Sequence, residues 1–116
     1  MNLSASKRLP AGLPEVLRAA HDVFINLTSD RILQIESLTI AINKGEDPEP
    51  AVKEIAQIAH KIAGVAGTLG YPDIGDLARS LEQSLKADIL AGAPLQNWST
   101  INPAIEDLLD AMEDVL

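Results

Sequence analysis

The sequence predicts an all-α protein, an antiparallel up-and-down four-helix bundle with an additional short N-terminal helix. Leu, Ile, Val and Ala supply most of the 47% apolar content, whereas aromatic residues supply only 3%, which favours packed helices over sheets. Apolar residues recur at spacings of three and four, and Gly and Pro separate these segments. At 116 residues the chain is long enough for one domain. We expect a flexible N-terminal arm over residues 1–12 and the bundle over residues 13–116.

The charge balance and the composition exclude several kinds of partner. Nine Lys and Arg against 17 Asp and Glu give a formal net charge of −8, without a basic cluster that could grip a phosphate backbone, so we expect no nucleic-acid binding. We find neither the apolar segment of a signal peptide nor a run long enough to span a membrane. The absence of cysteine leaves the redox compartment undetermined. We expect a monomeric cytoplasmic protein.

Two helical segments are predicted before the first strong break. Pro14 suits the first turn of a helix over residues 14–25. Residues 28–30 can cap a second helix, which should end at Gly45. These two segments could also form one bent helix. Their apolar positions are Val16, Leu17, Ala20, Phe24 and Leu27, then Ile32, Ile35, Leu38 and Ile42.

Residues 46–50 contain two prolines and are predicted to form a linker. The central helix should then run from near Pro50 to Gly70, because a glycine often follows a helix end in the left-handed conformation. After a sharp turn at residues 71–72, Asp73 can cap the next helix together with Asp76. The buried stripe of this helix is predicted to contain Ile74, Leu77, Ala78, Leu81, Leu85 and Ile89.

The last helix is predicted to start at Asn102 and Pro103, after a break at Gly92 and Pro94. Trp98 in the preceding loop should pack over one end of the bundle. A lone aromatic residue on a loop can also contact a partner protein. The apolar side of the helix consists of Ala104, Ile105, Leu108, Leu109, Met112 and Leu116.

His60 is the centre of the candidate site. At about 100° per residue, it lies opposite an apolar seam on the central helix. This seam contains Ile55, Ile58, Ile62, Val65 and Leu69. Around His60 itself lie small or polar residues, among them Lys53, Ala56, Gln57, Ala63, Gly64 and Gly67. Because each glycine costs a helix interior about 1 kcal/mol relative to alanine, the two glycines indicate a need for space. We therefore predict an exposed imidazole that a partner can approach closely.

The segment His60-Lys61-Ile62-Ala63-Gly64, followed by Leu69-Gly70, resembles the signature H-x-L-K-G-x-x-x-x-x-G of histidine-containing phosphotransfer (HPt) domains. The resemblance covers approximately residues 32–86. One departure is Ala63, which stands where the family often has Lys. Lys61 is a substitute seen in a subgroup with the pattern H-[KR]-[LI]-A-G. Glu82 also stands where similar sequences often carry Glu, but we interpret it as an exposed carboxylate that pairs with Lys86.

The resemblance implies that His60 accepts a phosphoryl group from an aspartyl phosphate on a receiver domain and passes it to another receiver. Response-regulator receivers would be the partners, including that of a hybrid histidine kinase, and the partner would bring Mg²⁺. Neutral imidazole is a suitable nucleophile for this step. We expect Lys61, Lys53 and Gln57 to stabilise the phosphoryl group. The expected partner-docking residues are Ala56, Ala63, Gly64 and Gly67.

A helical adaptor that docks a receiver or a kinase through the same face, without phosphoryl chemistry, is the alternative. There is no phosphate-binding loop, so we expect neither nucleotide binding nor autokinase activity. Lys61 differs from the acidic residue found in histidine kinase dimerisation helices. Neither histidine has the Glu three residues earlier that two-metal bundles use, so we expect no metal site or cofactor. A Ser-His-Asp arrangement stays open but unsupported. His21 is interpreted as a surface or packing residue.

Overall fold

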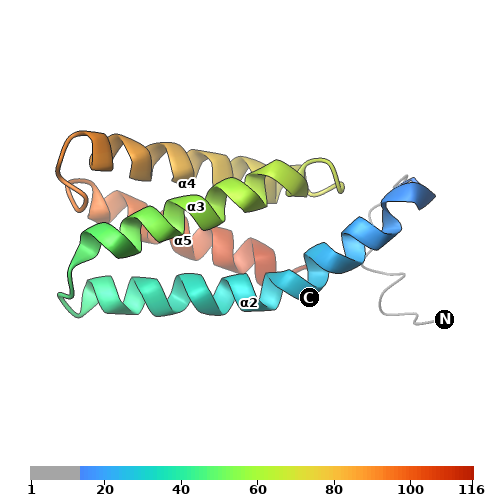
Figure 1. Cartoon of the computed structure of the whole chain (residues 1–116), viewed down its shortest axis with the longest axis horizontal. Helices are drawn as coiled ribbons and strands as arrows, with labels where there is room; N and C mark the ends of the chain where they lie inside the picture. Colours follow the sequence, from blue (N-terminus) through green and yellow to red (C-terminus); the bar gives the residue numbers. More distant parts are fainter. Residues whose placement is uncertain (1–13) are drawn as a thin grey trace.

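The computed structural model describes residues 14–116, which contain a short 3₁₀ helix and four α-helices. The arm expected over residues 1–12 lies outside the described residues. The elements are η1 (Glu15–Leu17), α2 (Arg18–Asn43), α3 (Pro48–Ala66), α4 (Pro72–Leu90) and α5 (Trp98–Glu113). The four α-helices run up and down in turn (Figure 1). This arrangement confirms the predicted all-α bundle, and no strand occurs in the described range.

Helix α2 is one continuous helix rather than two. The hydroxyl of Thr28, where a cap was predicted, donates to the backbone carbonyl of Phe24 at 2.7 Å. Thr39 makes the same bond to Ile35 at 2.8 Å. A buried threonine hydroxyl that bonds back by one turn is satisfied inside a helix, so it does not have to end one. As a result α2 spans the bundle and continues past the other helices (Figure 1).

The connections between the helices are short. Gly45, Gly70 and Gly92 have φ angles of 87°, 92° and 70°, a region that glycine enters without the penalty of a Cβ atom. Gly70 thus has the predicted left-handed conformation, although α3 itself ends at Ala66. The predicted linker over residues 46–50 is too long, because α3 begins at Pro48. Asp47 caps this helix by accepting from the backbone N–H of Glu49 at 3.3 Å.

Two other predicted helix starts are wrong. Asp73 lies inside the first turn of α4, and the N-cap Tyr71 makes no side-chain capping bond. Helix α5 begins at Trp98, four residues before the predicted start, and it contains Pro103 within its first turns. Pro103 is the sixth residue of the helix, so it lacks an N–H group that could donate to the carbonyl of Ser99, one turn earlier.

The connection from α4 to α5 is held by a buried carboxylate. Asp88 is 2% exposed and accepts from Asn97 through both its backbone N–H at 3.1 Å and its side-chain amide at 2.7 Å. Trp98 packs against the core, as predicted, and its Nε1–H donates to Asn43 Oδ1 at the end of α2 at 2.9 Å. These bonds tie the loop to the end of the bundle.

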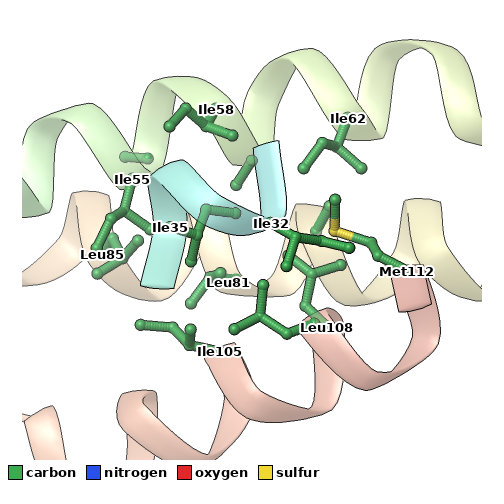
Figure 2. Packing of buried hydrophobic residues seen from close by; sticks show 14 of the residues in the cluster. Ile32, Ile35, Ile55, Ile58, Ile62, Leu81, Leu85, Ile105, Leu108 and Met112 are labelled. Atoms are coloured by element: carbon green, nitrogen blue, oxygen red, sulfur yellow. The ribbon is translucent and has the colours of Figure 1, made fainter. Parts of the chain in front are cut away.

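The core is formed by aliphatic side chains from all four α-helices (Figure 2). Helix α3 packs most extensively on α4. A Cβ atom added at Gly75 would lie 3.4 Å from the backbone nitrogen of Gly67, an ordinary van der Waals distance. Helix α5 packs on α4 and α2 and therefore lies across the bundle from α3. Within residues 14–116 no helix combines the length and the apolar character that a membrane crossing requires.

Candidate functional site

His60 projects from the middle of α3, and its side chain is 72% exposed. On the opposite side of the helix, Ile55 and Ile62 are fully buried and Ile58 is 7% exposed. This arrangement confirms the geometry that the helical period predicts. The exposed ring nevertheless has a fixed partner, because its Nδ1 lies 2.9 Å from Oε2 of Glu82 on α4.

Glu82 is a buried residue, and the expectation of an exposed carboxylate is wrong. It is 8% exposed, and α3 packs over it. The predicted pairing with Lys86 is confirmed, since Lys86 Nζ lies 2.6 Å from Oε2 of Glu82. The Lys86 hydrogen bond is the main cause that lowers the pKa of Glu82. Desolvation opposes this shift, and the charge of His60 adds to it when the ring is protonated. Glu82 is therefore ionised at neutral pH.

The ionised carboxylate decides which nitrogen of His60 carries the proton. A carboxylate can only accept hydrogen bonds, so Nδ1 of the neutral imidazole must hold its hydrogen to donate to Glu82. The lone pair then lies on Nε2, at the other side of the ring. Because the side chain is 72% exposed, a reactive nitrogen on a fixed ring is presented at the surface.

A groove of about 380 Å³ lies beside His60, between α3 and α4. Three ammonium groups line it, which contrasts with the formal charge of −8 for the whole chain. Lys53 pairs with Glu49 at 2.9 Å but remains 52% exposed. The sequence pattern predicted that Lys86 pairs with Glu82, but it did not place Lys86 in the site. Its position one turn after Glu82 was the available signal that it lies near His60. The lining residues are Lys53, Ala56, Gln57, His60, Lys61, Glu82, Lys86 and Ile89.

The small residues around His60 divide into exposed and covered positions. Gly64 and Gly67 are exposed, and a Cβ atom added at either would meet no neighbour within 4 Å among the described residues. Ala63 is half-buried. Ala56 is only 3% exposed, so its prediction as a solvent-facing docking residue is wrong. It lies on the flank of α3 that faces α4 and forms the floor of the groove there.

One position of the predicted apolar seam is exposed. Val65 is 40% exposed, whereas the next seam residue, Leu69, is buried. Val65 lines a second groove between α3 and α2, and this groove leaves its side chain partly uncovered. The helical period of α3 alone does not contain this information.

His21 belongs to the interior, in agreement with a packing role. It is 2% exposed, its Nε2 lies 2.8 Å from the hydroxyl of Tyr71, and the two rings stack with centroids 5.6 Å apart. Among residues 14–116, no group of three or more His, Cys, Asp or Glu side chains is arranged to hold a metal ion.

Comparison of the sequence with known protein families matches the Hpt domain over residues 19–115. Searches of curated proteins and of solved structures gave no match. The matched range includes all four α-helices apart from the first residue of α2. Four packed α-helices with a histidine exposed on one of them agree with this match. The chain therefore belongs to the Hpt domain family of phosphotransfer carriers in two-component phosphorelays.

Proposed function

We propose that this protein is a phosphorelay intermediate in which His60 accepts a phosphoryl group from the aspartyl phosphate of one receiver domain and passes it to another. The observation that carries the proposal is the contact between His60 Nδ1 and Glu82 Oε2 at 2.9 Å. This contact leaves Nε2 as an unprotonated nucleophile on a side chain that is 72% exposed.

The transfer forms one bond and breaks one. The Nε2 lone pair attacks phosphorus, and the bond from phosphorus to the aspartate oxygen of the receiver breaks, so that the carboxylate leaves with its electron pair. Nε2 carries no proton in the reacting tautomer, so no base has to remove one. The ring becomes cationic as the N–P bond forms, and Glu82, which accepts from Nδ1, offsets this charge. The reverse step returns the phosphoryl group to a second aspartate.

The groove beside His60 supplies cations for the transferred group. Phosphoryl transfer depends mainly on positioning and on charge neutralisation. Lys61 and Lys53 line the groove together with Gln57, and we assign these three residues to the stabilisation of phosphoryl oxygens. Lys86 lines the same groove and holds Glu82 in place. The receiver would contribute Mg²⁺, which neutralises charge on the phosphoryl oxygens.

The exposed surface next to His60 suits the approach of a receiver. Gly64 and Gly67 leave open space on this side of α3, and half-buried Ala63 adds little bulk. We assign these three residues to partner docking. The protein would act as a monomeric carrier in the cytoplasm, without nucleotide binding or autokinase activity of its own.

A transfer assay tests the proposal. Receiver domains that have been labelled with ³²P on aspartate are incubated with the protein and Mg²⁺. We expect an acid-labile, base-stable label on the protein that His60→Gln abolishes while circular dichroism shows an unchanged helical fold. Mass spectrometry should place the phosphate on the peptide with His60 and not on that with His21, which is 2% exposed.

Two results would contradict the proposal. A protein that binds receivers but never becomes labelled would be an adaptor that docks through the same face. A label that persists in His60→Gln would place the phosphoryl group on another residue.

A further inference from the structure

A second groove of about 340 Å³ lies on the other flank of α3, between this helix and α2. Its walls are mainly aliphatic, and three of the lining residues remain well exposed: Val23 at 56%, Leu27 at 40% and Val65 at 40%. Gly64 also lines it. Because Gly64 lies one turn after His60, the groove begins about 6 Å along the helix axis from the phosphorylation site.

One cationic side chain lies in this apolar groove. Arg31 of α2 lines it, and its Nη1 is buried without a hydrogen-bond partner among the described residues. Desolvation lowers the pKa of Arg31, in agreement with a guanidinium group that has lost water without gaining an anion. An unpaired, partly buried charge is unfavourable in the free protein, and among protein side chains a carboxylate is the anion whose geometry matches guanidinium.

We propose that Arg31 is a specificity-determining residue that binds a carboxylate of the receiver domain, while an aliphatic side chain of the same receiver segment fills the groove between Val23, Leu27 and Val65. This inference rests on the proposed function, since it concerns the partner that delivers or receives the phosphoryl group. A partner seated in the groove covers Gly64 and therefore lies beside His60. The missing side chain of Gly64 lets the backbone of that partner approach α3.

Charge complementarity selects the occupant of the groove. Residues 1–13 of this chain contain Lys7 and Arg8 but no Asp or Glu, so they cannot supply a side-chain carboxylate to Arg31. A second copy of the chain could supply one. Such a copy would cover the surface next to His60 and exclude a receiver, which makes it a competing occupant that the experiment below distinguishes.

The inference is tested with Arg31→Gln, which removes the charge but keeps a polar side chain that can donate a hydrogen bond. Arg79→Gln is the matched control, because Arg79 is an exposed arginine on α4 that pairs with Asp76 and does not line the groove. The probe is the receiver domain that gives the fastest transfer to wild-type protein, or the tightest-binding receiver if none transfers. Its dissociation constant is measured by titration calorimetry, and labelling of His60 by the small donor phosphoramidate is measured in parallel.

We expect Arg31→Gln to weaken receiver binding about tenfold or more, because a charge-assisted hydrogen bond is lost, and Arg79→Gln to change it less than twofold. Labelling by phosphoramidate should stay unchanged in both variants. The unfolding midpoint of Arg31→Gln should be equal to or higher than that of the wild type, whereas a merely structural arginine would lower it. Arg31→Glu should be rescued by a receiver variant in which one surface Asp or Glu is replaced by Arg.

Wild-type receiver affinity in Arg31→Gln would overturn the inference and leave the proposed function intact. A dimer of the free protein that dissociates in Arg31→Gln, with unchanged receiver affinity, would instead assign the groove to a second copy. Failure of every receiver to label His60 would contradict the proposed function, and the calorimetric comparison would still decide the role of Arg31.

Discussion

The ring of His60 is held by a carboxylate that belongs to the neighbouring helix. Glu82 accepts from Nδ1 at 2.9 Å and is itself held by Lys86 at 2.6 Å. The three side chains form a chain of charge-assisted hydrogen bonds that fixes both the orientation and the tautomer of the ring. In the proposed transfer Glu82 is thus a positioning residue, since it would act on the phosphoryl group through His60.

Replacement of Glu82 by Gln should slow phosphoryl transfer about tenfold. The neutral amide accepts more weakly than the carboxylate, by about 1–1.5 kcal/mol, and its NH₂ group can donate to Nδ1 and so favour the tautomer with a proton on Nε2. Single-turnover transfer from a phosphorylated receiver measures the rate. Glu54→Gln, an exposed position on α3, makes the same charge change and should leave the rate unchanged. Equal rates for wild type and Glu82→Gln would remove Glu82 from the mechanism.

The lowered pKa of Glu82 also predicts a pH dependence of stability. Since the folded-state pKa lies below the unfolded value, Glu82 stabilises the protein above the unfolded pKa of about 4.3, and this contribution disappears as pH falls through the folded pKa. The difference in unfolding free energy between wild type and Glu82→Gln should therefore be constant near neutral pH and shrink in acid. Urea denaturation at a series of pH values measures it. A difference that grows below pH of about 4 would mean that the pKa is raised.

The sequence predicts that His60 is exposed, but it does not predict that Glu82 is the hydrogen-bond partner of the ring. The 3.6-residue period places the ring opposite three buried residues of its own helix, and this inference needs no other segment. Glu82 lies one turn after buried Ala78 and one turn before buried Leu85, which was the available signal of its burial. Its contact with His60 depends on the rotation of α4 against α3, and the sequence pattern does not define that rotation.

At the scale of the element, α3 combines a buried apolar side with an exposed side that carries small residues next to His60. Gly64 weakens the helix, and the space it leaves is open. Gly64→Ala should raise the free energy of unfolding by about 0.5–1 kcal/mol, because alanine is the better helix former and its Cβ meets no neighbour. Thermal and urea denaturation measure this gain.

A large side chain at the same position should impair receiver transfer. Gly64→Leu, and equally Gly67→Leu, should keep the helical fold but reduce receiver transfer by at least an order of magnitude, since a leucine side chain would occupy the surface that a receiver must cover. Gly64→Ala serves as the control for a small addition. Wild-type transfer rates in both leucine variants would show that the docking surface lies elsewhere.

Helix existence was predictable from periodicity, whereas several helix ends were not. The start of α5 was predicted at Asn102, because Asn-Pro is a strong start signal, but tertiary contacts of Trp98 and Asn97 extend the helix to Trp98. A cap predicted at Thr28 is absent because its hydroxyl bonds to Phe24. In both cases the hydrogen bonds that the side chains make in the folded protein, and not the local start signal, agree with where the helix begins or continues.

At the scale of the whole molecule, the core draws on all four α-helices, whereas the site lies on α3 and α4 alone. The basic groove is lined only by α3 and α4, whereas α5 packs across the bundle on α4 and α2. The fold class was predictable because aliphatic residues at helical spacing fill all four segments. Ala56 was predicted to be exposed and is buried, whereas Val65 was predicted to be buried and is exposed. The way in which α4 and α2 pack beside α3 decides both, and the helical period of α3 does not contain this information.

This separation predicts that stability can be lost without loss of function. Ile105→Ala on α5 removes a fully buried side chain and should lower the free energy of unfolding by about 2–5 kcal/mol. At a temperature where the variant stays folded, its transfer rate should remain within about twofold of wild type. Ile40→Ala, at a position that is 53% exposed, is the matched control and should change stability by less than about 0.5 kcal/mol. A transfer defect in folded Ile105→Ala would show that α5 shapes the site.

The central claim is that Nε2 of His60 carries the phosphoryl group while Nδ1 stays bonded to Glu82. Long-range ¹H–¹⁵N NMR spectra of the uniformly ¹⁵N-labelled protein, recorded before and after phosphorylation by a receiver, test it most directly. We predict a protonated Nδ1 and an unprotonated Nε2 in the free protein, and coupling of ³¹P to Nε2 after transfer. Phosphorus coupled to Nδ1, or no change in the His60 ring after incubation with phosphorylated receivers, would contradict the account.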